Sequence, residues 1–324
     1  MAVYVNTNYS ALQGQRYLGN VQNSLTTTYQ RLSSGMRINS AKDDAAGLQI
    51  ADRLTSQING LNQGNRNASD GIALAQTIES GMDEISGMIQ KMRTLAVQAN
   101  NGTNTAEDRK SLGKEIQALA TEVNRIATKT TFAGKTVLNG TSADDSSIFG
   151  KDANNKGGSA TKAGAEGTMT LQVGSNKGDT ISFKMTSVMF SAIADDANKN
   201  IINEGGGKIF KADGAGGFIV NLSGAKTDQS AESISSLIEQ FDKMLSKVDG
   251  MRADLGAIQN RLESSIRNQS NVAANEADAR SRIRDADFAE ESANLSQQSI
   301  IQQAAASMLM QANTRPQLGL SLLG

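Results

Sequence analysis

Two adjacent aspartates, Asp43 and Asp44, lie in the segment SSGMRINSAKDDAAG at residues 33–47. Paired carboxylates can bind a metal ion, carry out acid–base chemistry, or begin a helix. A metal site needs further oxygen or nitrogen ligands nearby, and the residues that follow are alanine, glycine and leucine. Ser40 and Asp43 have the S-x-x-D spacing of a capping box, which binds free amides at a helix N-terminus. We therefore interpret this segment as a helix start.

The composition argues against catalysis elsewhere in the chain. There is no histidine and no cysteine, which removes the commonest general base, the commonest metal ligand and all thiolate chemistry. The segment DADF at 285–288 contains part of a calcium-loop pattern but lacks its glycine and its bidentate glutamate. Thr105 and Asp108 form a second capping box. We expect no enzyme, no metal site and no cofactor.

Charge and hydropathy exclude two classes of partner. The 32 basic and 33 acidic residues give a formal charge of −1, which provides no field to attract nucleic acid or an anionic membrane. The mean hydropathy is −0.38, and no apolar run approaches the roughly 18 residues of a membrane span. The first residues lack a basic segment followed by an apolar core, so we expect no cleavable secretory signal peptide.

The hydrophobic pattern predicts long helices. Apolar residues alternate three and four apart through both arms of the chain, as in coiled-coil seams. The only proline is Pro316, so almost the whole chain is free of this helix breaker. The strongest seam lies in the C-terminal arm, with a core at Leu237, Phe241, Val248, Leu255, Ile258 and Leu262. We predict a mainly α fold, in which the N- and C-terminal arms form a long antiparallel coiled-coil helical bundle.

The centre of the chain differs from both arms. It holds 15 of the 31 glycines, between Gly140 and Gly224, and alternating apolar residues at 168–185 predict a β-hairpin. A weaker strand is predicted within 216–224. We expect a small β-hairpin and loop-rich central section, with variable, surface-exposed insertions at 141–167 and 195–229. The flanks are expected to form an inner terminal helical domain (1–44 and 276–324) and an outer coiled-coil rod (45–140 and 168–275).

Both ends of the chain are unusually apolar. All four tyrosines lie within the first 29 residues, and the chain finishes in the uncharged segment LGLSLLG. Exposed leucines at a terminus would reduce solubility unless something covers them. We therefore expect the two ends to be buried against each other and against other copies of the chain.

Several long motifs resemble those of bacterial flagellins. LSSGMRINSAKDDAAGLQIADRLTSQINGL, MRTLAVQANNGTNTAEDR and EVNRIATKTTFAGKTVLNG resemble the N-terminal signature, and SRIRDADFAEESANLSQQSIIQQAAASMLMQAN with LSLLG resembles the C-terminal one. The resemblance covers about residues 1–140 and 230–324. The chain departs from the family at Gly324, where many relatives end in Arg or Gln, and at Arg284, where an acidic residue is common.

The resemblance implies a structural subunit of the bacterial flagellar filament. Such a subunit is exported unfolded through the flagellar type III apparatus, polymerises at the distal tip into a homopolymer used for swimming, and is extracellular. The implied partners are identical subunits, the export apparatus, an export chaperone at the C-terminal segment, and the filament cap and junction proteins. A hook–filament junction protein, which shares related terminal segments, is the alternative.

Further site residues follow from the pattern and the resemblance. Exposure on the bend between the inner and outer helices suggests subunit contacts at Arg37, Lys42 and Asp44. The resemblance implies a face read by a vertebrate Toll-like receptor at Gln90, Lys91, Arg93, Leu95 and Glu115. Lys91 stands where Arg is usual and cannot reproduce its bidentate contact, so an ordinary solvated or subunit-facing surface is the favoured alternative. Family analogy also suggests O-linked sugars at Ser146, Ser159 and Thr161.

Overall fold

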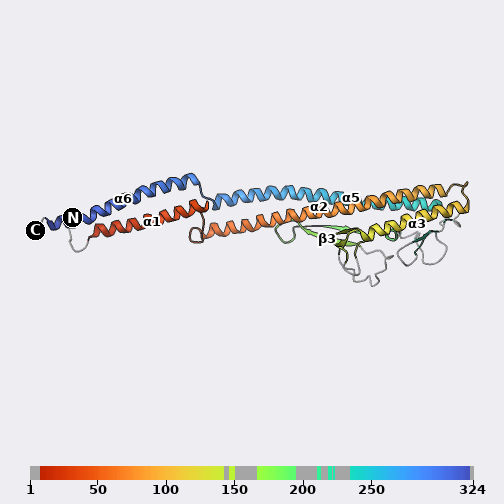
Figure 1. Cartoon of the computed structure of the whole chain (residues 1–324), viewed down its shortest axis with the longest axis horizontal. Helices are drawn as coiled ribbons and strands as arrows, with labels where there is room; N and C mark the ends of the chain where they lie inside the picture. Colours follow the sequence, from red (N-terminus) through yellow and green to blue (C-terminus); the bar gives the residue numbers. More distant parts are fainter. Residues whose placement is uncertain are drawn as a thin grey trace. The chain divides into compact units, whose positions relative to one another are not determined.

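The computed structural model describes residues 8–141, 146–149, 166–194, 210–212, 218–220, 222 and 234–321. Six helices account for most of them (Figure 1): α1 Tyr9–Ser34, α2 Ala45–Ala99, α3 Ala106–Lys129, α4 Phe190–Ala194, α5 Ile234–Arg284 and α6 Phe288–Ser321. The predicted mainly α fold, with long terminal helices and a small β-containing centre, is confirmed.

Three antiparallel two-stranded sheets lie in the central section. Their strands are β1 Thr131–Phe132, β2 Lys135–Thr136, β3 Gly167–Gln172, β4 Thr180–Met185, β5 Phe210–Ala212 and β6 Phe218–Val220. β3 and β4 form the hairpin predicted at 168–185, with Leu171 opposite Ile181. β6 falls within the weak strand predicted at 216–224, and its partner β5 was not predicted.

The chain forms two compact units. The first contains Met1–Asn59 and Asn271–Gly324, and the second contains Gly60–Ser270. The boundaries expected from the sequence, at residues 44 and 276, lie nearer the helix breaks. The two units instead meet between residues 59 and 60 and between residues 270 and 271. Both points lie inside helices, α2 and α5, that continue without interruption. The inner and outer domains therefore stay a prediction.

The second unit has an apolar core between α2, α3 and α5. The seam of α2 is buried over more than three turns, from Ile78 through Met82, Ile85 and Ile89 to Met92. From α5, all six residues named for the seam are buried: Leu237, Phe241, Val248, Leu255, Ile258 and Leu262. Burial of a Leu or Ile side chain contributes about 1.5–3 kcal/mol, so these positions account for much of this unit's stability.

Three glycines on α2 receive the β3–β4 hairpin. A Cβ added to Gly60 would lie 2.6 Å from Cβ of Ser175, and one added to Gly64 would lie 2.6 Å from the carbonyl carbon of Val173. At Gly71 an added Cβ would clash with the Leu171 side chain. We call Gly60, Gly64 and Gly71 the glycine seat. Their missing side chains let the hairpin lie directly on the helix.

Candidate functional site

The turn before α2 is closed by Asp43. Its Oδ2 accepts hydrogen bonds from the amide of Ser40 at 2.9 Å, the amide of Asn39 at 3.1 Å and the Ser40 hydroxyl at 3.2 Å. The Ser40 amide, then the Asn39 amide, lowers the pKa of the Asp43 carboxyl below its ordinary value. Asp43 is therefore held as a carboxylate by its own turn.

The capping box predicted for Ser40 and Asp43 is not formed. A box starting at Ser40 requires the helix to begin at residue 41, but α2 begins at Ala45. Asp44 caps the helix instead, because its Oδ1 accepts a hydrogen bond from the amide of Gly47 at 2.9 Å. The sequence pattern identified a helix start correctly and assigned it to the wrong aspartate.

The bend between α1 and α2 is joined to the break between α5 and α6. Gly35 has a left-handed φ of 69° and its carbonyl accepts a hydrogen bond from the amide of Ala286 at 3.0 Å. The amides of Arg37 and Ile38 donate to the carbonyl of Arg284 at 2.7 and 3.3 Å. The Ile38 side chain is 1% exposed. We call this set of backbone hydrogen bonds the bend clamp.

Two of the three residues predicted to contact other subunits, Arg37 and Asp44, already bind groups of their own chain. The Arg37 guanidinium donates to the carbonyl of Ile283 at 2.8 Å, near the end of α5, so this side chain already binds its own chain. Asp44 is half-buried and caps α2. Lys42 is exposed. Contacts of these residues with other subunits stay a prediction.

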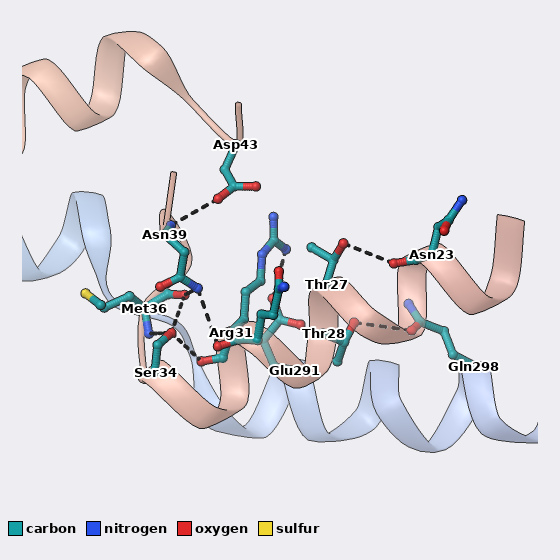
Figure 2. A network of polar contacts seen from close by, with 11 residues as sticks. Asn23, Thr27, Thr28, Arg31, Ser34, Met36, Asn39, Asp43, Glu291 and Gln298 are labelled. Atoms are coloured by element: carbon teal, nitrogen blue, oxygen red, sulfur yellow. Dashed lines mark hydrogen bonds and ion pairs between the residues drawn. The ribbon is translucent and has the colours of Figure 1, made fainter. Parts of the chain in front are cut away.

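Polar side chains fix how α1 lies along α6 in the first unit (Figure 2). Arg31 forms an ion pair with Glu291 at 3.0 Å, and the Thr28 hydroxyl donates to Oε1 of Gln298 at 3.2 Å. Farther along, the side-chain amide of Asn8 donates to the carbonyl of Ala312 at 2.8 Å. Each contact joins residues more than 250 positions apart, so the pattern of one arm alone could not reveal it.

This terminal pair, α1 with α6, has no apolar core of its own within the part that the structure describes. The single buried residue of α1 is Thr28, and among residues 288–314 of α6 the single buried one is Glu291. Apolar side chains are instead exposed: nine of the twelve large exposed ones lie on these two helices. They are Tyr9, Leu12, Tyr17 and Tyr29 on α1, and Phe288, Ile300, Ile301, Met308 and Met310 on α6.

A hollow of about 890 Å³ runs between the two helices. Tyr17 and Val21 of α1 line it from one side, and Ile301, Ala305 and Met308 of α6 from the other. An isolated pair of helices with such an open apolar surface is only marginally stable in water. The terminal pair is therefore the candidate binding surface of the chain.

The predicted receptor face is only partly at the surface. Lys91 forms an ion pair with Glu115 of α3 at 3.0 Å, and Arg93 pairs with Asp242 of α5 at 2.5 Å. Gln90 is exposed. Leu95 is 8% exposed and belongs to the core. Its inclusion in an exposed face was wrong, because the helical repeat turns residue 95 toward the seam.

The second capping box is present at the start of α3. The Thr105 hydroxyl and amide donate to Oδ2 of Asp108 at 2.7 and 3.0 Å, and the Asp108 amide donates back to the hydroxyl at 3.2 Å. The hydroxyl bond, then the amide bond, lowers the pKa of the Asp108 carboxyl. This aspartate is engaged in helix capping.

Of the suggested sugar acceptors, Ser146 is exposed. Ser159 and Thr161 lie outside the described residues, as does the end of the LGLSLLG segment. Among the residues that the structure describes, no cluster of His, Cys, Asp or Glu could hold a metal ion. Within the same residues, none of the helices combines the length and the apolar character needed to cross a membrane.

A helical chain whose exposed apolar side chains gather on a terminal pair is typical of a subunit of a larger assembly. Residues 5–143 match the model of the bacterial flagellin N-terminal helical region, and residues 238–323 match that of the bacterial flagellin C-terminal helical region. The chain is 38% identical to Flagellin D of Vibrio anguillarum and 38% identical to Flagellin A of Vibrio cholerae, over 100% of each chain. It belongs to the bacterial flagellin family.

One solved structure shares the architecture. A protein assigned as flagellar hook-associated, from Vibrio parahaemolyticus, covers 75% of this chain and 100% of its own with a TM-score of 0.55. The two are 16% identical, so this likeness concerns the fold alone. The chain is similar over its full length to proteins named flagellin, which favours a flagellin over a hook-associated protein.

Proposed function

We propose that this chain is the structural subunit that self-assembles into the helical filament of the bacterial flagellum and serves swimming motility. The observation that carries the proposal is the terminal pair, in which the only fully buried side chains among the described residues are polar while nine large apolar side chains are exposed. Such a pair gains most of its apolar burial only when further copies pack against it. Family membership over the whole chain supports the same function.

The difference in apolar burial between the second unit and the terminal pair fits this role. The second unit buries a continuous apolar seam in a single copy, whereas α1 and α6 do not. A segment that cannot bury enough apolar surface alone is ordered when it binds, and the binding energy then offsets its ordering entropy. We expect the terminal pair to become fully ordered in the filament, where it forms the inner part and the second unit the outer part.

The hook–filament junction protein is the alternative function. Both types of subunit share this fold, so the fold does not distinguish them. The flagellins of Vibrio anguillarum and Vibrio cholerae match the present chain from end to end, which favours the filament subunit.

Seeded polymerisation tests the proposal. Purified subunit is added to short filament seeds, and growth is followed by light scattering and electron microscopy. We expect micrometre-long helical filaments that grow in proportion to the subunit supplied. Capping of the seeds without elongation, or formation of short oligomers only, would favour the junction protein.

We further propose that the subunit acts outside the cell and without catalysis. In this scheme it is exported unfolded by the flagellar type III apparatus, with a chaperone bound to its C-terminal segment, and is added at the tip beneath the cap. The exposed apolar side chains of α6, such as Ile300 and Met308, support a need for a covering partner before assembly. Copurification of a small chaperone with the full chain, and its loss on deletion of residues 310–324, would test this step.

Receptor recognition and glycosylation are two further proposals. A receptor approaching Gln90, Lys91, Arg93 and Glu115 would meet two ion pairs already made within the chain, Lys91–Glu115 and Arg93–Asp242. Exposed pairs of this type contribute about 0–1 kcal/mol, so they could be exchanged for a partner's groups. Binding of a Toll-like receptor to the wild type and to Arg93→Ala would test the face, and mass mapping of the native filament would test Ser146, Ser159 and Thr161.

A further inference from the structure

The methionines of this chain fall into two groups by exposure. Met308 and Met310 on α6 are 68% and 67% exposed. Every other methionine in the described part of the chain is buried or half-buried; Met82, Met92, Met189 and Met244 are at most 1% exposed. An oxidant in solution therefore reaches the two α6 thioethers far more easily than the other methionines in the described part of the chain.

The two exposed methionines flank a contact within the terminal pair. Leu309 lies between them in sequence and packs on α1, where a Cβ added to Gly14 would be 3.2 Å from its Cδ1. Met308 also lines the apolar hollow together with Tyr17, Val21 and Ile301. Both thioethers thus lie on the surface that the proposed function assigns to contact with further copies.

We propose that Met308 and Met310 are peroxide-sensitive modification sites, and that their oxidation in the unassembled subunit blocks polymerisation. This inference rests on the proposed filament function. In each reaction the thioether sulfur attacks one oxygen of hydrogen peroxide, the O–O bond breaks, and a sulfur–oxygen bond forms with release of one water molecule. The sulfur loses two electrons, the peroxide gains them, and no further reactant is required.

The product changes the surface in a defined way. A thioether is apolar and adapts its shape to neighbours, whereas a sulfoxide is polar and rigidly shaped. Burying such a group without hydrogen-bond donors is unfavourable. The hollow that Met308 lines is apolar at Tyr17, Val21, Ile301 and three alanines, and polar at Ser10, Gln13, Gln311 and Thr314. A neighbouring copy that packs on the apolar part would bury the sulfoxide there without a donor, so the oxidised subunit should add to a filament poorly. Assembly should in turn protect the two methionines, because they become covered.

The experiment uses the full chain. Purified subunit is treated with hydrogen peroxide, the peroxide is removed, and the oxidised residues are identified by peptide mass mapping before seeded growth is measured. We expect Met308 and Met310 to be oxidised first and the growth rate to fall about tenfold, the effect of roughly 1.4 kcal/mol in addition to the filament end. Treatment with a methionine sulfoxide reductase and a dithiol should restore the rate.

Two double variants make the test specific. Met308→Leu with Met310→Leu keeps the apolar volume nearly constant, so it should polymerise like the wild type both before and after peroxide. Met88→Leu with Met251→Leu removes two half-buried thioethers and leaves the α6 pair intact, so it should remain sensitive. The same peroxide dose given to finished filaments should oxidise Met308 and Met310 more slowly than in free subunits.

Three results would overturn the inference. One is unchanged growth of wild-type subunit whose map shows both α6 methionines oxidised. Another is oxidation of a buried methionine before them. The third is equal sensitivity of the α6 double variant and the wild type. A subunit that never polymerises before treatment would instead refute the proposed function, and the peptide map would still decide which methionines react.

Discussion

Replacing Gly64 by alanine tests whether the glycine seat holds the β3–β4 hairpin on α2. The new Cβ would lie 2.6 Å from the carbonyl carbon of Val173, and an ordinary contact of this kind begins at 3.4 Å. The Val173 carbonyl oxygen would lie closer still, so the strand end must retreat by more than about 0.8 Å. Backbone is in the way, so no rotation of a side chain can relieve the clash.

The cost can be worked out from the contacts that the retreat disturbs. Overpacking costs about 1–3 kcal/mol, and a gap of 0.5–1 Å already removes about a quarter to a half of the dispersion energy of the atoms that face it. The hydrogen bond from the Asn67 side chain to the carbonyl of Gln172, 2.9 Å long, is worth about 1 kcal/mol. Alanine returns about 1 kcal/mol through its better helix propensity. We expect a net destabilisation of about 2 kcal/mol.

Gly87→Ala is the matched control. It changes the same residue type in the same helix, but a Cβ at Gly87 would have no atom within 4 Å. Only the propensity gain remains, so this variant should be more stable than the wild type by about 1 kcal/mol. The two variants should therefore differ by roughly 3 kcal/mol, with opposite signs relative to the wild type.

Two measurements are needed because the chain has two compact units, and unfolding need not be a single transition. Urea titration followed by circular dichroism gives the stability of the second unit. Amide hydrogen exchange across Gly167–Gln172 and Thr180–Met185 reports whether the hairpin itself opens more often in Gly64→Ala. Equal urea midpoints for the two variants, with unchanged hydrogen exchange in the hairpin, would refute the idea that the glycine seat holds the hairpin on α2.

Three further predictions address the seam, a helix cap and the terminal pair. Leu262→Asp should destabilise the second unit by several kcal/mol because Leu262 is fully buried and an unpaired charge is costly there; an unchanged thermal midpoint would contradict this. The pKa of Asp108 is lowered in the folded chain, so the cap stabilises α3 above the ordinary pKa of 3.8 and its contribution disappears as the pH falls through the lower, folded value. The difference in urea midpoint between wild type and Asp108→Ala should accordingly shrink in acid, and a constant difference would show that the carboxylate is not responsible. Deleting residues 310–324 should abolish seeded polymerisation while circular dichroism still reports a helical second unit; wild-type growth would exclude a role for the end of α6.

The seam and the start of α3 could be predicted from the sequence because they depend on local spacing. Leu237 to Leu262 repeat three and four apart, and these positions are buried as the repeat requires. The alternating apolar residues predicted the β3–β4 hairpin in the same way, while its register, with Leu171 opposite Ile181, comes from the structure. Such features depend only on residues within a few tens of positions of one another.

The features that could not be predicted depend on residues distant in sequence. Gly64 looks like a weak point in a helix until Val173 is placed against it. The bend clamp joins Gly35 to Ala286, and nothing near either residue indicates the other. Asp43 and Asp44 are a different case: both are plausible caps, and a four-residue shift in the start of α2 decided between them. Periodicity places a helix reliably but not its first residue.

In the terminal pair, the contacts that set the register of α1 on α6 are not the ones that would stabilise the pair. A largely buried ion pair such as Arg31–Glu291, whose Glu291 side chain is 9% exposed, loses about as much hydration energy as it gains in attraction. Together with the Thr28–Gln298 bond it selects one register of α1 on α6 while adding little net stability. Leu309 and other apolar side chains between the helices are only half-buried, and nine large apolar side chains of the pair are exposed. We expect such a subunit to become fully ordered at α1 and α6 only when neighbouring copies cover Tyr17, Ile300 and Met308, which are exposed in a single copy. The polar contacts would then ensure that each copy presents the same surface. Growth of a regular filament requires both properties, because a terminal pair that was stable alone would have no apolar surface left for its neighbours.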